Sequence, residues 1–314
     1  MIFAARCIGF SLAVFVLVYA ALSFVVSRGW RFLLGVSKPC LASDSADLLF
    51  NLRMAPLAVS VGVTLLFTLP SFLWLEPRSA DEAIGAAPVV LGAACLLWFA
   101  VGTVRAAAAH FRTSRAVAEW LGSGSVMEAG SKIPVVRTPN APGLTVAGVR
   151  SPKVFVSEAT MAVLTPAELR TAVRHELSHV RRRDNLKKLL IRFAVFPGMA
   201  DLQRQWSDAT EMAADDAAVS SRREALDLAA ALIKVSRLGP MESSPALAIG
   251  LLHSSTVLSA RIERLFGWET VQASQARSSW WYSLPAGAIA LILVALTYSS
   301  ALLRMHALTE WLVR

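Results

Sequence analysis

The chain has 314 residues, of which 55% are hydrophobic and only 17% are charged. Soluble domains usually carry about 45–50% apolar and about 25% charged residues, so the composition argues against a wholly soluble protein. The net charge is +9, but no nucleic-acid recognition motif accompanies it. Contact with an anionic membrane surface accounts for the basic excess, and we expect no nucleic-acid partner.

Four apolar runs without a charged residue are long enough to cross a bilayer, which takes about 20 helical residues. The first three form an expected N-terminal membrane region over 1–104, with spans at about 7–26, 54–75 and 84–104. A cleaved signal peptide is the alternative for the first run, but its apolar stretch exceeds the usual length of such a segment.

Basic residues near the span ends predict the orientation. Arg28 and Arg31 follow the first span, and Arg105 and Arg112 follow the third. The short turn after the second span is acidic instead. Because positive charge near span ends marks the cytoplasmic side, we expect 27–53 and the region after residue 104 to face the cytoplasm.

Residues 105–283 are the one stretch large enough for a domain outside the bilayer, and their length suits a single domain. Short apolar runs at 133–136, 144–149 and 153–158, separated by turn-rich segments, predict a small β-sheet with a hairpin. A helix with a strong start signal follows the sheet. Thr165, Pro166 and Glu168 form a capping box with proline at the first helical position.

This helix carries the sequence H-E-L-S-H. His175 and His179 lie four residues apart, so both imidazoles project from one face of the helix. Glu176 lies beside them, as in the H-E-x-x-H zinc motif, where the histidines bind the metal and the glutamate is the general base. The alternative is a chance match of two surface histidines. A third ligand would make that alternative much less plausible.

The segment 187–199 is apolar but contains Arg192 and Pro197. It is too short and too charged to be a span, so it belongs either to a core or to a hairpin at the membrane interface. We favour contact with the interface. The preceding run Arg181–Arg183 is expected to be an exposed basic edge, with Asp184 paired to it.

A third metal ligand is predicted on a helix over 206–221. Glu211 lies 32 residues beyond His179, and Asp215 follows on the same helix face. Glu211 can complete the metal site, while Asp215 can accept the free N–H of a ligand histidine. The alternative is a solvated acidic face, but the neighbouring residues are alanine, valine and methionine, among which unpaired carboxylates are unfavourable.

Two further helices are expected at 223–238 and 255–267, and the fourth span at 284–303 precedes a short tail, 304–314. No oxyanion-stabilising residue is obvious. His253 is the best candidate for an oxyanion or substrate contact, although a histidine satisfied within the core or on a helix surface is the competing interpretation.

The motif "HELSHVRRRDNLKKLL" followed by "ATEMAADDAAV" resembles the integral-membrane zinc peptidases related to the β-lactam sensor-transducers and antirepressor peptidases. The resemblance covers most of 50–300 and is strongest over 144–219. It implies that His175, His179 and Glu211 bind one Zn²⁺, that Glu176 activates water, and that Asp215 orients a histidine.

The chain departs from this group in two ways. The β-lactam receptors carry an extracellular penicillin-binding domain after the last span, whereas this chain ends about ten residues beyond it, so direct antibiotic sensing is not expected. Ala214 stands where relatives often have cysteine, which affects no expected ligand.

We therefore expect a mainly α membrane protein with four transmembrane helices and a zincin-like α+β metallopeptidase domain. Its expected function is a zinc endopeptidase of a bacterial inner membrane that cuts a protein or peptide partner, such as a regulator in a signalling pathway. A substrate could add as a strand beside Val149, Val154 and Val156. The alternatives are a quality-control or prenyl-protein-processing protease, and a signalling scaffold without catalysis, for which Glu176 would be superfluous.

Overall fold

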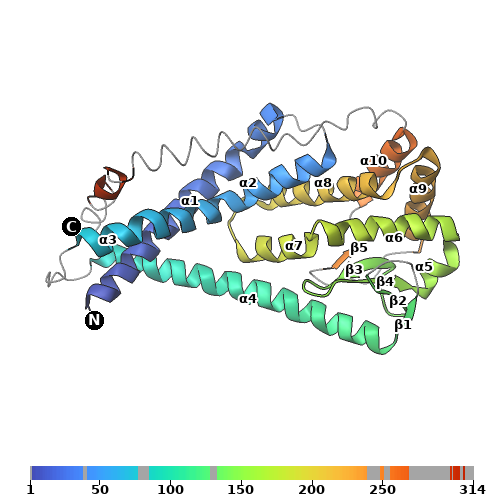
Figure 1. Cartoon of the computed structure of the whole chain (residues 1–314), viewed down its shortest axis with the longest axis horizontal. Helices are drawn as coiled ribbons and strands as arrows, with labels where there is room; N and C mark the ends of the chain where they lie inside the picture. Colours follow the sequence, from blue (N-terminus) through green and yellow to red (C-terminus); the bar gives the residue numbers. More distant parts are fainter. Residues whose placement is uncertain are drawn as a thin grey trace.

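The computed structural model describes most of the chain. The described residues are 2–37, 41–76, 85–127, 133–238, 248–250, 255–268, 298, 300–304 and 307. Long helices extend towards one end of the molecule, and the strands and shorter helices gather at the other (Figure 1).

The N-terminal region is built from α1 (Ile2–Ser37), α2 (Ala42–Val63), α3 (Leu69–Leu75) and α4 (Ala86–Gly122). A single π-helical stretch, η1 (Thr64–Thr68), joins α2 to α3 in one continuous rod. Among the residues that the structure describes, three helical segments are long and apolar enough to cross a membrane, namely Phe3–Val36, Ala42–Leu75 and Ala86–Gly122. The chain is therefore a membrane protein. The fourth expected span, 284–303, lies largely outside the described residues.

These helices are longer than the apolar runs that predicted them. α1 continues past Arg28 and Arg31, and α4 continues past Arg105 as far as Gly122. Charged residues limit the part of a helix that can face lipid, but they do not end the helix. The expected boundary between 104 and 105 therefore falls within an unbroken helix.

The sheet has five described strands, β1 (Ser125–Met127), β2 (Val135–Thr138), β3 (Leu144–Ala147), β4 (Lys153–Ser157) and β5 (Ala248–Gly250). Their order is β1-β2-β4-β3-β5. The β2–β4 pair is parallel, and the other pairs are antiparallel. The predicted hairpin is confirmed as β3 and β4, whose turn begins at Gly148 with a φ of +103°, a conformation that favours glycine.

The sheet does not offer the open edge that the substrate-strand hypothesis requires. β4 lies between β2 and β3, and the second side of β3 is covered by β5. Val154 and Val156 are fully buried in this arrangement, and Val149 lies in the hairpin turn. The expectation that a substrate adds to either strand is therefore wrong, because the chain itself supplies the missing neighbour.

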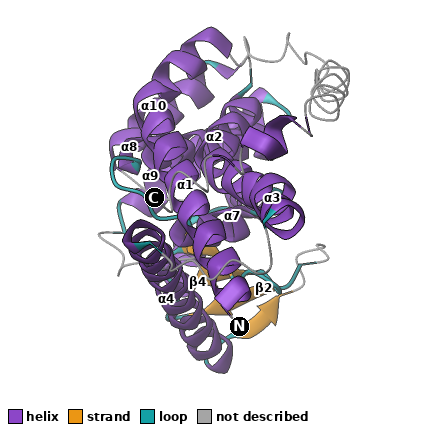
Figure 2. Cartoon of the chain, turned by 90° about the vertical axis from the view of Figure 1, so that its left-hand side faces the viewer, coloured by secondary structure: helices purple, strands orange, loops and turns teal. Residues whose placement is uncertain are grey.

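Six helices follow the sheet or flank it. They are α5 (Glu158–Val163), α6 (Pro166–Arg181), α7 (Asp184–Phe193), α8 (Ala200–Ala218), α9 (Arg222–Ser236) and α10 (Ser255–Phe266). The largest core cluster joins residues of β2, β3 and β4 to α6, α9 and α10. In the view of Figure 2 the strands lie beside α4, and most helices lie to one side of them.

α8 begins at Ala200, six residues before the predicted start, because the interruption at Pro197 and Gly198 ends just before it. α8 also packs against α2. Trp30 of α1 and Leu49 of α2 share an apolar cluster with Trp206 of α8. The part of α1 near Trp30 and the part of α2 near Leu49 therefore pack directly on α8.

Candidate active site

The start of α6 fixes the helix that carries the H-E-x-x-H motif. The Thr165 hydroxyl accepts a hydrogen bond from the Glu168 backbone N–H at 3.3 Å, and the Glu168 carboxylate accepts one from the Thr165 N–H at 2.8 Å. This is the predicted capping box, and it satisfies two backbone donors that the helix cannot. Lys234 of α9 adds an ion pair to Glu168 at 2.8 Å, so α6 is tied to α9 at its first turn.

All three motif residues point into the protein. His175 and Glu176 are fully buried, and His179 is 1% exposed. On the neighbouring helix α8, Glu211 and Asp215 are also buried, among Ala213, Ala214 and Ala218. The close packing of α6 against α8 brings these two sets of side chains together.

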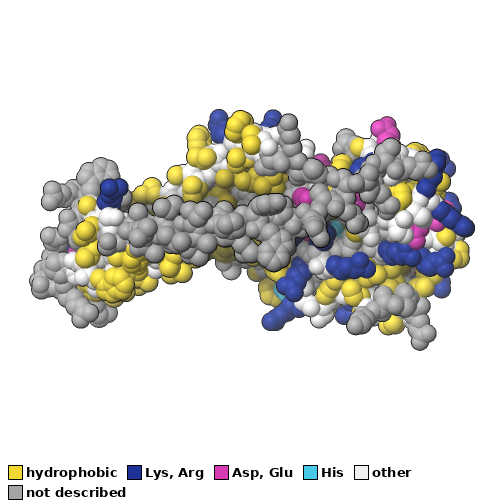
Figure 3. Space-filling model, turned by 45° about the horizontal axis from the view of Figure 1, so that its top comes forward, with side chains coloured by type: hydrophobic (Ala, Val, Ile, Leu, Met, Phe, Trp, Pro, Cys, Tyr) yellow, Lys and Arg dark blue, Asp and Glu magenta, His cyan; other side chains and the backbone are white. Residues whose placement is uncertain are grey.

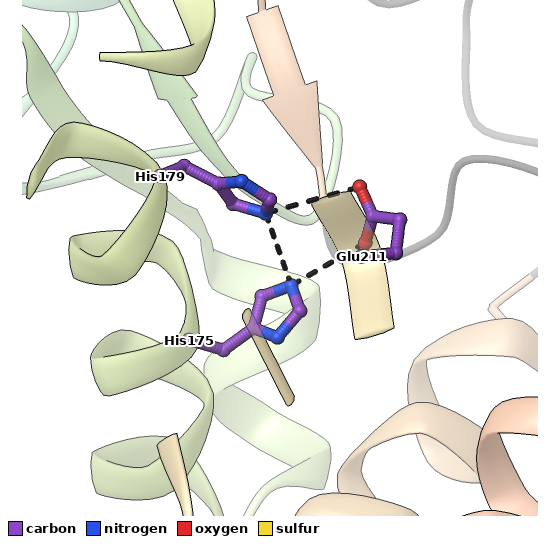
Figure 4. Close-up of side chains that lie close together, drawn as sticks. All are labelled: His175, His179 and Glu211. Carbon is purple, nitrogen blue, oxygen red and sulfur yellow. Dashed lines mark hydrogen bonds and ion pairs between the residues drawn. The ribbon is translucent and has the colours of Figure 1, made fainter. Parts of the chain in front are cut away.

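Three of these side chains converge on one point (Figure 4). The Nε2 atoms of His175 and His179 lie 3.3 Å apart. The Glu211 carboxylate lies 3.4 Å from Nε2 of His175 and 3.8 Å from Nε2 of His179. One donor atom from each residue falls within 4.8 Å of the others. Two imidazoles and a carboxylate in this arrangement form a group that can hold a metal ion.

The other ring nitrogen of each histidine faces a second carboxylate. Nδ1 of His175 lies 3.0 Å from Asp215, and Nδ1 of His179 lies 2.8 Å from Asp184. A carboxylate at Nδ1 holds the proton on that nitrogen and leaves the Nε2 lone pair free to bind a metal. Burial lowers the pKa of His175, but the contacts with Asp215 and Glu211 raise it to about 9 in the absence of a metal, so a metal ion that binds at Nε2 must displace a proton.

Asp184 has a different role from the one its sequence neighbours suggested. The chain turns at Arg183, which adopts the left-handed conformation with a φ of 55°. α7 then begins at Asp184, whose side chain is fully buried and aimed back at His179. The expected pairing with the preceding arginines holds in part, but this reversal also carries Asp184 away from the surface and against His179. Arg182 still lies 4.0 Å from it.

Glu176 lies beside the three converging side chains but is not one of them. Among the described residues its carboxylate oxygens make no regular hydrogen bond, and the backbone of Val146 is the polar group that faces them. Burial raises the pKa of Glu176 to about 8. A buried carboxylate without a partner is unfavourable, and a water molecule at the neighbouring metal site would give it one. The residues present therefore fit a metal ion with a proton acceptor beside it.

Arg261 of α10 is a part of the site that the sequence did not predict. Its guanidinium donates two hydrogen bonds to Asp215, at 2.8 and 2.7 Å, and lies 3.1 Å from Glu211. Burial opposes its charge, but Asp215 and Glu211 raise the pKa of Arg261. Its position on the apolar face of an amphipathic helix, between Leu258 and Leu265, was the signal that could have revealed it.

Lys188 is a second unpredicted neighbour of the site. It lies on α7 one turn after Asp184, is partly buried, and interacts electrostatically with Glu211 and Glu176. Burial lowers its pKa to about 8, although the nearby carboxylates act in the opposite direction. The site therefore contains positive groups from both α7 and α10.

The connection between α7 and α8 is attached to all three membrane helices. Tyr19 of α1 donates a hydrogen bond to the Val195 carbonyl at 2.9 Å, and Trp98 of α4 donates to the same carbonyl at 2.7 Å. Arg53 of α2 donates to the Ala194 carbonyl. The predicted interfacial segment thus packs on the spans themselves, and it connects them to both helices that carry Asp184 and Glu211.

The candidate oxyanion or substrate contact stays a prediction. His253 lies outside the described residues. Asp216, which follows Asp215 on α8, forms an ion pair with Arg264 at 2.6 Å in a partly exposed position.

The fold and the site together define a membrane protein with a buried His-His-Glu group suited to a metal. Comparison with known families agrees with this class. The family model described as BlaR1 peptidase M56 matches residues 78–265, which is more than half of the chain. The chain belongs to this family of metallopeptidases. No curated protein matches it.

Proposed function

We propose that the chain is a zinc-dependent endopeptidase that cleaves a protein partner. The substrate that we favour is a regulator in a signalling pathway. The observation that carries this proposal is the convergence of His175, His179 and Glu211 within 4.8 Å, with the buried carboxylate of Glu176 beside them. A non-catalytic scaffold would have no use for Glu176 in such a position.

In this proposal one Zn²⁺ is held by the Nε2 atoms of His175 and His179 and by the Glu211 carboxylate. Two imidazoles and one carboxylate are a known ligand set of catalytic zinc, which leaves a position open for water or substrate. When bound, zinc supplies polarisation of the scissile carbonyl and lowers the pKa of the attacking water. Asp215 and Asp184 keep each histidine in the tautomer that the ligand role requires.

Glu176 is the proposed general base. It takes a proton from water as the water oxygen bonds to the carbonyl carbon, and it delivers that proton to the amine nitrogen as the C–N bond breaks. Burial raises the pKa of Glu176 above that of an exposed glutamate, so its carboxylate is the stronger proton acceptor of the two. Arg261 balances the negative charge of the carboxylates that surround it.

We further propose that the peptidase domain spans 105–283, followed by a fourth transmembrane helix at 284–303, and that it faces the cytoplasm of a bacterial cell. The basic residues after the first and third spans support this orientation. The shared cluster of Trp30, Leu49 and Trp206 supports the placement of the first loop and the peptidase domain on one side.

The test compares new protein N-termini in cells that encode the chain naturally and in the same cells with Glu176→Gln. We expect at least one protein partner to have an N-terminus that disappears in the variant. Glu263→Gln, at an exposed position of α10, is the matched control and should leave the cut in place. Identical sets of N-termini in wild type and Glu176→Gln, with both proteins present in the membrane, would contradict the proposal.

A further inference from the structure

Three arginines surround the place where α7 crosses α4. The two helices touch there, since a Cβ atom added to Gly102 would lie 2.4 Å from the Phe193 carbonyl oxygen. Arg192 precedes Phe193 on α7, and Arg105 lies one turn after Gly102 on α4. Arg112 follows Arg105 by seven residues, so both lie on one face of the helix.

The three positive charges lie close enough together to repel one another. Burial lowers the pKa of Arg192, and the charges of Arg105 and Arg112 lower it further. Within the described part of the chain, neither Arg105 nor Arg112 takes part in an ion pair, whereas Arg115 pairs with Glu119 at 3.1 Å. Like charges gathered in this way favour an anion between them.

An exposed apolar stripe leads from the span to these arginines. Leu97, Val101 and Val104 of α4 are 67%, 42% and 66% exposed, and their spacing places them on one side of the helix. Arg105 is the first charged residue after them. The arginines therefore lie at the level where a lipid-facing surface gives way to charge. On the face displayed in Figure 3, hydrophobic side chains prevail at the span end, and Lys and Arg gather towards the other end.

We propose that Arg105, Arg112 and Arg192 bind the phosphodiester headgroup of an anionic phospholipid whose acyl chains lie along Leu97, Val101 and Val104. Guanidinium groups suit a phosphodiester because they donate pairs of parallel hydrogen bonds to its oxygens. The adjoining apolar stripe favours a lipid over a soluble phosphate, since only a lipid can contact the arginines with its phosphate and the apolar stripe with its acyl chains. This site is separate from the metal group and does not depend on the proposed cleavage.

The test uses the full chain in nanodiscs of phosphatidylcholine with a minor fraction of phosphatidylglycerol. Lipids that remain bound after release into detergent are counted by native mass spectrometry. We expect the wild type to retain phosphatidylglycerol in preference to phosphatidylcholine. In the variant Arg105→Gln/Arg112→Gln/Arg192→Gln, the ratio of retained phosphatidylglycerol to retained phosphatidylcholine should fall about fivefold for each arginine removed.

The control variant Arg170→Gln/Arg223→Gln/Arg237→Gln removes the same charge from exposed positions on α6, on α9 and just after α9 and should keep the preference. Arg105→Gln and Arg112→Gln are also measured singly, because both residues are exposed and their loss leaves the fold intact. Equal retention in wild type and in all these variants would overturn the proposal. Displacement of the lipid by millimolar inorganic phosphate would overturn the choice of a lipid.

Discussion

Asp184 and His179 lie 2.8 Å apart although they belong to different helices, because the chain reverses at Arg183 between α6 and α7. Asp215 lies 3.0 Å from Nδ1 of His175, a close contact without the hydrogen-bond alignment of the His179–Asp184 pair. Each imidazole of the metal group is thus oriented by a carboxylate from another helix. The geometry of the site depends on the packing of α6, α7 and α8 as well as on the motif.

The first prediction concerns Asp184→Asn. Loss of a carboxylate that orients a ligand histidine typically weakens metal binding by 10–100-fold, and we expect this for zinc. The measurement is competition with a chelator of known affinity. Asp216→Asn is the matched control, because Asp216 pairs with Arg264 at the surface and touches no histidine. Equal zinc affinity in Asp184→Asn and wild type would contradict the assigned role.

The second prediction concerns Arg261→Met. Removal of one partner of a buried ion pair typically destabilises a protein by about 3–5 kcal/mol, because the remaining charge stays buried. We expect such a loss in metal-free protein, where Glu211 and Asp215 would keep no arginine partner. The loss should be smaller with zinc bound, since the metal balances Glu211. Thermal unfolding with and without chelator measures both values.

Arg264→Gln provides the control for Arg261, since it lies on the same helix and pairs at the surface with Asp216. It should change stability by less than about 1 kcal/mol. If zinc gave Arg261→Met no more protection than it gives the wild type, the charge-balancing role of Arg261 would be refuted.

Much of this architecture could be predicted from local sequence signals. The apolar runs predicted three membrane-crossing helices, and the capping residues Thr165 and Glu168 predicted where α6 begins. These features depend on residues close together in the chain, so short-range physical chemistry determines them. The place of Glu211 beside the histidines was also anticipated, from its spacing and its apolar neighbours.

The parts that could not be predicted depend on contacts between distant segments. Arg261 meets Asp215 only because α10 packs on α8, and β5 reaches the side of β3 from about one hundred residues away in the sequence. The burial of Asp184 follows from a left-handed residue, Arg183, which no residue preference signals. Long-range packing of this kind leaves no local pattern in the chain.

The third prediction concerns the contact of α4 with α7. In Gly102→Ala the new Cβ would meet the Phe193 carbonyl oxygen at 2.4 Å, so the helices must separate. We expect a loss of about 1–3 kcal/mol, the usual effect of overpacking. Gly62→Ala, within α2, is the control, because nothing lies within 4 Å of its added Cβ. It should be neutral or slightly stabilising.

The free energies of unfolding of the two alanine variants are measured by chemical denaturation in the same detergent and compared. If Gly102→Ala were as stable as Gly62→Ala, the close approach of α4 and α7 would be wrong.

The fourth prediction is a pH dependence carried by Glu224 of α9. Hydrogen bonds from Ser220, at 2.8 and 2.6 Å, and the ion pair with Arg174 lower the pKa of Glu224 to about 2. Its value in an unfolded chain is about 4.3. Because the folded pKa is the lower one, the stabilisation is fully present above about pH 4.3 and is lost as the pH falls towards 2.

The free energy of unfolding of Glu224→Gln should therefore be lower than that of wild type by about 1 kcal/mol at pH 7, because partly exposed helix caps and ion pairs usually contribute about this much. The difference from wild type should disappear near pH 2. Glu119→Gln, which removes an exposed ion pair within one helix, should show less than half of that loss. A constant difference between pH 7 and pH 2 would exclude the proposed linkage.

The most direct test of the central claim is a paired measurement on purified Glu176→Gln, with zinc content and partner cleavage determined on the same sample. Glu176 is not one of the three converging ligands, so we predict one zinc per chain, as in wild type, and cleavage reduced by a factor of about 10²–10⁴. Unchanged cleavage with zinc retained would contradict the general-base role, and a wild type that binds no zinc would contradict the site itself.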